Sequence, residues 1–377
     1  MFDTDTKKIE EHWLGGFEPY GVTVNNEPAR TLFGHYERCG FLYPAKRTRL
    51  APVMTRVMET WDRTMRPAED QMLQYCVNCN ACRPGTWGSM SFWRSTPNRA
   101  HAQHLVNTGS PNASRLVMLA AQDAWHARGG LFVENWFRAE NRFANRIFGT
   151  ATERIGVEHS SLERRSLLAV PRGWAAKTRR TIAIEQLDSA AGCQAKHTLG
   201  ILADPVVAAA EELDDGDINM RGLDEEYRAA GLRRYRRVFL AALPGCREPV
   251  GIAIAYRGPI GLNFSFLENR CDLWISRELD HSLRHYIAQA LIGASESVYE
   301  DLALNHMVVA CDEETHAALS CRHTGMFIRT YSRCVWSRPG FWQWYCHADS
   351  FYQRILDFEQ RRRGSDHKQY TTNGGLV

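Results

Sequence analysis

The sequence predicts an α/β protein made of two mixed-sheet domains in tandem. In several segments apolar residues recur at three- and four-residue steps, which is typical of amphipathic helices. Other segments are short apolar runs bounded by Pro, Gly or Asn, which is typical of strands and hairpins. Because helices and strands follow in a similar order twice along the chain, we expect a duplicated unit.

Size and composition agree with two folded domains. The chain has 377 residues, of which 44% are hydrophobic and 24% charged, as in globular proteins. A formal net charge of +3 is not that of a strongly basic nucleic-acid binder. No run approaches the roughly 20 apolar residues of a membrane helix, and the polar N-terminus is not a signal peptide. The eleven cysteines are therefore expected to be free thiols of a cytoplasmic protein.

The first predicted domain covers residues 33–170 and follows an irregular leader, residues 1–32. A helix is expected after Pro44, because its apolar residues share a helical spacing: Leu50, Val53, Met54, Val57, Met58 and Trp61. The remaining elements are a hairpin over 72–95 with its turn at Pro84–Gly85, a strand over 100–106, a helix over 113–127, a strand over 131–137 and a short helix over 139–149.

The second predicted domain covers residues 198–356, after a junction at 171–197 and before a polar, frayed tail at 357–377. Its elements are a helix over 223–235, a hairpin over 236–258, a strand over 271–276, a long helix over 283–304, a strand over 306–311, a short helix over 313–326 and a last strand over 327–339. The two hairpins can be aligned with Cys82 and Cys246 in register. We expect the aromatic segment 340–352 to cover the core of the second domain or to form a dimer interface. The arginine-rich runs 233–237 and 361–363 are expected to be solvated.

Single positions in both halves resemble the late motif of the GNAT acyltransferases. In the second half Ala317, Gly325 and Met326 keep the spacing of that motif, with Glu314 and Cys321 in place of its Asn and Tyr. In the first half Asn141 and Ala144 keep it, with Phe148 in the tyrosine position. Together with the order of elements, the chain resembles a tandem GNAT-like protein with degenerate motifs, over roughly 33–168 and 220–340.

This resemblance implies transfer of an acyl or aminoacyl group from a thioester donor such as acyl-CoA to a small-molecule or protein amine. In the family a Gly-rich loop before a helix binds the CoA pyrophosphate through backbone N–H groups. The second half has no glycine in the matching RELDHSLRHY segment. The resemblance therefore implies a donor site in the first half, formed by Thr108, Gly109, Ser110, Asn112, Ser114 and Asn141.

The family's tyrosine acid is missing from both halves. Glu134, at the end of a predicted strand beside which the fold opens, is the expected general base, and His104 is the second candidate. Glu134 as a solvated strand-end residue and His104 as a hydrogen-bonded structural residue are the alternatives. At the level of function, the alternative is a non-catalytic ligand-binding or scaffold protein on a degenerate GNAT fold.

Cys76, Cys79 and Cys82 form a C-x-x-C-x-x-C pattern. Such spacing lets thiolates converge on zinc or an iron–sulfur cluster, with a fourth ligand such as Cys39 or His35. The segment CVNCNACRP also resembles the start of aminoacyl-tRNA–protein transferases, which implies tRNA as a partner. Alternatively, if this segment is a regular antiparallel strand, Cys76 and Cys79 point to opposite faces and the thiols are structural.

Overall fold

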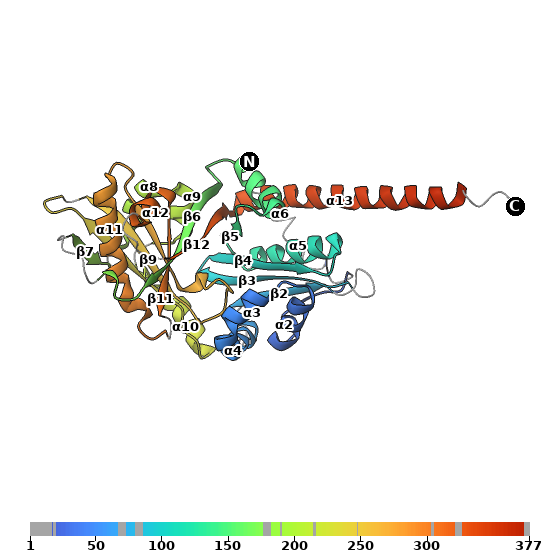
Figure 1. Ribbon diagram of the computed structural model, residues 1–377, viewed down its shortest axis with the longest axis horizontal. Coiled ribbons are helices and arrows are strands. Elements are labelled where there is room, and N and C mark those ends of the chain that lie inside the picture. Colours follow the sequence, from blue (N-terminus) through green and yellow to red (C-terminus); the bar gives the residue numbers. More distant parts are fainter. Residues whose placement is uncertain are drawn as a thin grey trace.

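The computed structural model describes residues 17, 20–66, 73–79, 86–175, 182–188, 191–213, 216–246, 248–302, 305–320 and 326–372 (Figure 1). The first half contains the elements β1(Val22–Val24), α2(Ala29–Arg38), α3(Pro44–Leu50), η2(Ala51–Val53), α4(Met54–Met65), β2(Gln74–Cys79), β3(Gly88–Thr96), β4(Arg99–Asn107), α5(Pro111–Ala127), β5(Phe132–Arg138), α6(Arg142–Ala144), η3(Asn145–Gly149), α7(Thr150–Ile155) and β6(Ser160–Pro171).

The second half contains β7(Ala183–Gln186), α8(Gly192–Leu202), α9(Pro205–Ala210), α10(Arg221–Ala229), β8(Tyr235–Ala242), β9(Pro249–Arg257), η6(Leu267–Asn269), β10(Arg270–Ile275), α11(His281–Ser295), η7(Glu296–Tyr299), β11(His306–Cys311), α12(Glu313–Ser320), β12(Met326–Ser337) and α13(Arg338–Thr372). Each half thus runs strand, helices, hairpin, strand, helix, strand, short helical segment and strand. The predicted α/β fold and its duplicated, GNAT-like order of elements are confirmed. No helix in the described ranges is long and apolar enough to cross a membrane.

The strands of the described residues form one 12-stranded sheet in the order β1-β2-β3-β4-β5-β12-β6-β11-β10-β9-β8-β7. Equivalent strands occupy equal positions from the two ends, so the order is palindromic, as expected for a duplicated unit. β4 and β5 are parallel, and so are β10 and β11, whereas the other neighbouring pairs are antiparallel.

At the centre of the sheet the two halves exchange their last strands. β12 pairs with β5 of the first half, β6 pairs with β11 of the second half, and β6 and β12 pair with each other. The two predicted domains are therefore each completed by a strand of the other. Local hydrophobic periodicity contains no information on this exchange, because it is the same whichever neighbour the strand pairs with.

Two expectations about segments outside the two predicted domains differ from the structure. The leader was expected to be irregular but contains β1 and the start of α2. The junction, for which no element was predicted, contains β7 and the start of α8. The tail was expected to fray, but α13 continues to Thr372. A helix that begins on a packed aromatic segment can continue through polar residues such as Gln, Glu and Arg, because their helix propensity is high.

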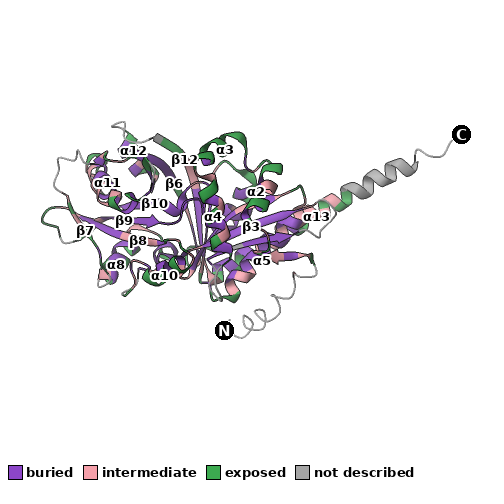
Figure 2. Ribbon diagram, turned by 90° about the horizontal axis from the view of Figure 1, so that it is seen from below, coloured by how far each residue is buried: buried purple, intermediate pink, exposed green. Residues whose placement is uncertain are grey.

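Three hydrophobic cores hold the elements together, and the central strands are buried along most of their length (Figure 2). The first core runs from α2 and α4 to α11, the second contains α5, α7 and α13, and the third contains α8, α9 and α10. The aromatic segment 340–352 was expected to pack on the core of the second half. It instead packs with α5 and α7 of the first half. The reason is that β12 ends beside β5, so the helix that follows it begins there.

Candidate active site

The parallel strands β4 and β5 separate after a short paired stretch. Arg99–Ala102 pair with Phe132–Asn135, and both strands then continue beyond their pairing. At this point β4 has a bulge, because Ser89 and Ser91 of β3 oppose Val106 and Gln103, which are three residues apart. His104 lies in the bulge with a φ of 54°. Since a bulge redirects side chains, His104 is placed where the two strands part.

His104 lies half-buried among aromatic rings. Its ring stacks on Phe264 at 4.2 Å and on Trp61 at 5.5 Å between centroids, and its Nδ1 atom has no hydrogen-bond partner among the described residues. Burial, with a smaller effect of the Lys46 charge, holds the pKa of His104 well below its usual range. The imidazole is therefore neutral at pH 7 and carries an unsatisfied ring nitrogen.

Lys46 on α3 lies at the edge of this aromatic group. Its Nζ atom is 3.7 Å from the centroid of the Phe41 ring, and Phe41 is in edge contact with His104. Burial, followed by the charges of Arg138, Arg49 and Arg329, lowers the pKa of Lys46 to about 8. Lys46 can therefore exchange a proton near neutral pH.

The second half contributes the segment between β9 and β10 to this region. Asn263 donates a hydrogen bond of 2.6 Å to Gln103 of β4, and Trp61 of α4 donates one of 2.7 Å to the carbonyl of Gly261. Gly261 has a φ of +88°, and a Cβ there would lie 2.3 Å from Val57, so the close approach requires glycine. The environment of His104 is thus built by both halves.

Glu134 lies in a fully buried ionic cluster at the seam between the halves. Its carboxylate is 3.3 Å from Arg99, 3.0 Å from Arg270 and 2.9 Å from Arg333, and it accepts a hydrogen bond from Trp136. Burial alone would raise the pKa of Glu134, but the three arginines outweigh it and hold the pKa well below the usual range. The solvated strand-end alternative is therefore wrong. A general base must contact its ligand, and in this structure the Glu134 carboxylate is buried out of reach of a ligand. The role of Glu134 as a base therefore stays a prediction.

The predicted donor loop forms the start of α5, and its polar groups are bonded within the protein. Ser110 caps the helix by accepting from the Ala113 amide at 3.3 Å. The Gly109 amide donates to Asn107 at 2.6 Å, the Thr108 hydroxyl accepts from the Trp87 amide at 2.7 Å, and the Ser114 hydroxyl accepts from Asn107 at 2.6 Å. Pro111, the first residue of α5, has no N–H to offer.

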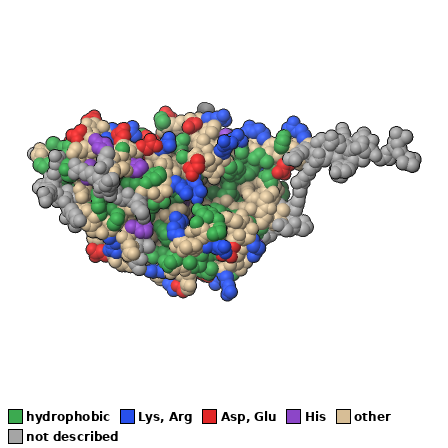
Figure 3. All heavy atoms as spheres, viewed as in Figure 1, with side chains coloured by type: hydrophobic (Ala, Val, Ile, Leu, Met, Phe, Trp, Pro, Cys, Tyr) green, Lys and Arg blue, Asp and Glu red, His purple; other side chains and the backbone are tan. Residues whose placement is uncertain are grey.

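The other two predicted donor-site residues are Asn141 and Asn112. Asn141 caps α6 by accepting from the Ala144 amide at 3.2 Å. Asn112 lines a pocket of about 580 Å³ between α5 and α13, together with apolar side chains such as Leu116 and Trp342. Figure 3 shows a hollow lined by hydrophobic side chains on this face of the first half. Asn141 and the loop thus each bond to their own helix N-terminus, and donor binding by these residues stays a prediction.

The described cysteines of the hairpin do not converge. Cys76 and Cys79 lie in β2 and belong to different cores, Cys76 beside α2 and α4 and Cys79 beneath α5. Burial raises the pKa of the Cys76 thiol to about 12, so it is not a thiolate at neutral pH. Cys82 lies outside the described residues, and in the described part of the chain no three metal-ligating side chains gather. This separation is what the regular-strand alternative predicts.

No family model matches the sequence, and no curated protein is significantly similar to it. Several solved structures are similar at low identity. A GCN5-related N-acetyltransferase from Sphaerobacter thermophilus is 11% identical, with a TM-score of 0.42 over 84% of this chain and 95% of that one. A GCN5-related N-acetyltransferase from Kribbella flavida is 15% identical, with a TM-score of 0.35 over 67% and 87%. A tandem GNAT protein from the clavulanic acid biosynthesis pathway is 10% identical, with a TM-score of 0.35 over 74% and 87%. The fold assignment above rests on the order of elements and the sheet topology.

Sequence reasoning missed the buried arginines, Lys46 and the 258–269 segment. One signal for the arginines was present, because an Asn-Arg pair stands at the start of both β4 and β10, as Asn98-Arg99 and Asn269-Arg270. A repeated pair at equivalent positions of a duplicated chain marks a shared structural element. The segment 258–269 had no such signal, because the first half has only Pro97 and Asn98 at the matching position.

Proposed function

We propose that this protein transfers an acyl group from a thioester donor to an amine, and that the reaction takes place beside His104 in the first half. The observation that supports this proposal is the separation of β4 from β5 at the bulge. Beyond Ala102, β4 has no β5 residue paired with it, so its backbone can hydrogen-bond an extended donor in the way a strand binds a peptide. The aromatic rings from both halves would enclose the reacting groups.

The side chains there suit the proton transfers of this reaction. The amine nitrogen forms a bond to the thioester carbonyl carbon, and the C–S bond breaks. His104 is neutral and has a buried, unpartnered Nδ1 atom, so it can take the proton of an amine that the same aromatic rings enclose. Lys46, with a pKa of about 8, can give a proton to the departing thiolate, because thiols have a similar pKa.

The test is release of CoA from acetyl-CoA in the presence of primary amines, measured for the wild type and for His104→Asn. Asn tolerates a positive φ, so this variant keeps the bulge and loses the base. We expect kcat/KM to fall by about 100-fold or more, with little change in melting temperature. His197→Asn, on the exposed surface of α8, is the matched control and should leave the rate unchanged.

Two results would contradict the proposal. Full activity of His104→Asn would remove His104 from the reaction. The absence of both CoA release and a thermal shift with millimolar acyl-CoA would favour the non-catalytic alternative, which is consistent with the internally bonded α5 loop. The described cysteines do not support the alternative of a tRNA-dependent, metal-bearing transferase, because they do not converge.

A further inference from the structure

The arginine-rich run 233–237 contains two buried side chains and three that line a pocket. Arg234 and Arg236 are fully buried, and their guanidinium groups donate to backbone carbonyls such as Ser95, Glu268 and Ile218. Because side chains alternate along a strand, Tyr235 and Arg237 face the other side of β8, and Arg233, which precedes the strand, lines the same pocket. The prediction that the whole run is solvated is therefore wrong for the two buried arginines.

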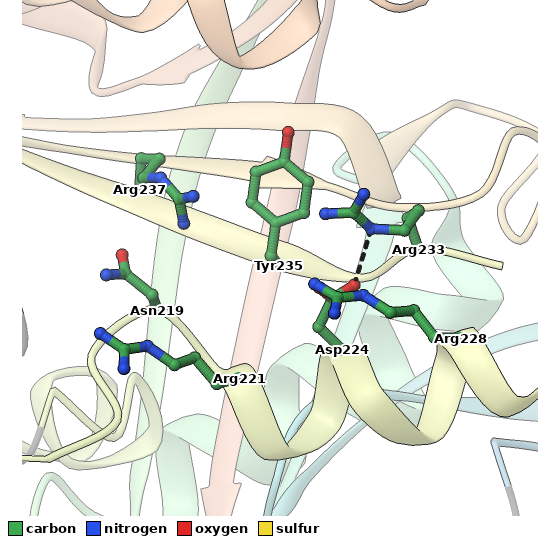
Figure 4. Close-up of a pocket in the computed structure, with 7 residues that line it drawn as sticks. All are labelled: Asn219, Arg221, Asp224, Arg228, Arg233, Tyr235 and Arg237. Carbon is green, nitrogen blue, oxygen red and sulfur yellow. Dashed lines mark hydrogen bonds and ion pairs between the residues drawn. The ribbon is translucent and has the colours of Figure 1, made fainter.

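The outward side chains of β8 form one wall of a pocket. Its volume is about 250 Å³, and its lining comes from β8, from α10 and from the loop before α10: Asn219, Arg221, Asp224, Arg228, Arg233, Tyr235 and Arg237. Arg233 and Arg237 flank Tyr235, and the α10 side chains lie opposite them (Figure 4). The guanidinium carbons of Arg233 and Arg237 are 5.2 and 4.8 Å, respectively, from the centroid of the Tyr235 ring. These contacts fix both arginines at the wall of the pocket.

The charge of the lining favours an anion. It contains four arginines and one carboxylate, that of Asp224. Asp224 accepts from Arg228, from Arg233 at 3.1 Å and from the Arg234 amide at 3.0 Å, so its own charge is already neutralised. The pocket therefore presents a clear excess of positive charge. Guanidinium groups bind phosphate through paired N–H donors, which makes arginine the usual residue for this class of ligand.

Two further observations indicate which protein groups bind the ligand and which chemical groups the ligand carries. The amides of Arg221 and Gly222 at the start of α10 already donate to Asp217, at 2.5 and 3.1 Å, so recognition falls to the arginine side chains and not to the helix N-terminus. The Oδ1 atom of Asn219 is buried and has no hydrogen-bond partner among the described residues. An unsatisfied acceptor beside cationic groups fits a ligand that carries a hydroxyl donor as well as anionic oxygens.

We propose that the pocket between α10 and β8 binds a small phosphate monoester with a free hydroxyl group, of the sugar-phosphate class. The phosphoryl oxygens accept from the guanidinium groups, and the hydroxyl donates to Asn219. A pocket of about 250 Å³ encloses a small ligand and not a nucleic-acid strand. This site lies in the second half and does not depend on acyl transfer at His104.

The test is isothermal titration of the full chain with ribose 5-phosphate, inorganic phosphate and ribose. We expect the wild type to bind ribose 5-phosphate, to bind inorganic phosphate more weakly and not to bind ribose. Arg221→Gln with Arg237→Gln should weaken ribose 5-phosphate binding at least tenfold. Asp224 pairs with Arg228 and Arg233, so the double variant keeps those pairs, and the melting temperature, measured in parallel, checks that the fold is kept. Asn219→Ala should reduce binding of ribose 5-phosphate but not of inorganic phosphate.

The matched control is Arg30→Gln with Arg56→Gln, two exposed arginines of α2 and α4, which should bind as the wild type does. The proposal is overturned if the wild type binds no phosphate compound at millimolar concentration, or if the double variant Arg221→Gln, Arg237→Gln binds as well as the wild type. It is also overturned if only a single-stranded RNA oligonucleotide binds and its binding is lost in that double variant.

Discussion

At the scale of single residues, Glu134 is the clearest case of a role decided by its neighbours. Arg99, Arg270 and Arg333 face Glu134, Glu211 and Asp272 in a cluster where all six side chains are fully buried. Three positive and three negative charges balance. Removing one partner of a buried pair leaves a charge uncompensated. We therefore expect Glu134→Gln to lower the free energy of unfolding by about 3–5 kcal/mol, measured by urea denaturation.

The control is Glu37→Gln, because Glu37 is half exposed and pairs with Arg47 at 4.0 Å. Surface pairs of this kind contribute about 0–1 kcal/mol. If Glu134→Gln is as stable as the wild type but loses turnover, Glu134 is a catalytic base and the cluster is not its main role.

At the scale of elements, α13 belongs to the core of the first half although it follows the last strand of the second. Trp344 is fully buried, stacks on Phe148 at 5.7 Å between centroids and donates to the Ile147 carbonyl at 2.8 Å. Truncating a buried tryptophan leaves a cavity and removes these contacts. Trp344→Ala should therefore lower the free energy of unfolding by about 3–5 kcal/mol, measured by thermal and urea unfolding.

Trp342 on the same helix provides the matched control, because 36% of its surface is exposed. Trp342→Ala should cost clearly less than Trp344→Ala, since less apolar area is lost from the interior. Equal losses in the two variants would show that α13 does not pack as a core element.

At the scale of the whole molecule, the exchange of β6 and β12 joins the halves into one folding unit. Without the second half, β5 and β6 lose β12 between them, and Glu134 loses Arg270 and Arg333. Exposed strand edges and unpaired charges both oppose folding. We expect fragments 1–175 and 176–377 to lack a cooperative unfolding transition when made separately, and to form a folded one-to-one complex when co-expressed.

Circular dichroism and size-exclusion chromatography of the two fragments, alone and together, test this expectation. Two fragments that each unfold cooperatively by themselves would show that the halves are independent domains. The uncut chain is the reference for the melting temperature of the reconstituted complex.

The sequence by itself determined the features that depend on local patterns. Helical spacing from Leu50 to Trp61 and alternation in the hairpins are properties of neighbouring residues, and the repeated order of elements revealed the duplication. The positions of Glu134 at a strand and His104 beside it were predicted in the same way. The regular-strand reasoning for Cys76 and Cys79 also needed only the alternation of side chains.

Only the tertiary structure decided which distant residues meet. The insertion of β12 beside β5, the ion pairs of Glu134 with Arg270 and Arg333, and the contact of the 258–269 segment with β4 all join residues more than one hundred positions apart. Local periodicity does not specify such partners, because a strand has the same pattern next to any neighbour. The same reason explains why the aromatic segment 340–352 was expected in the core of the second half and lies in the core of the first half.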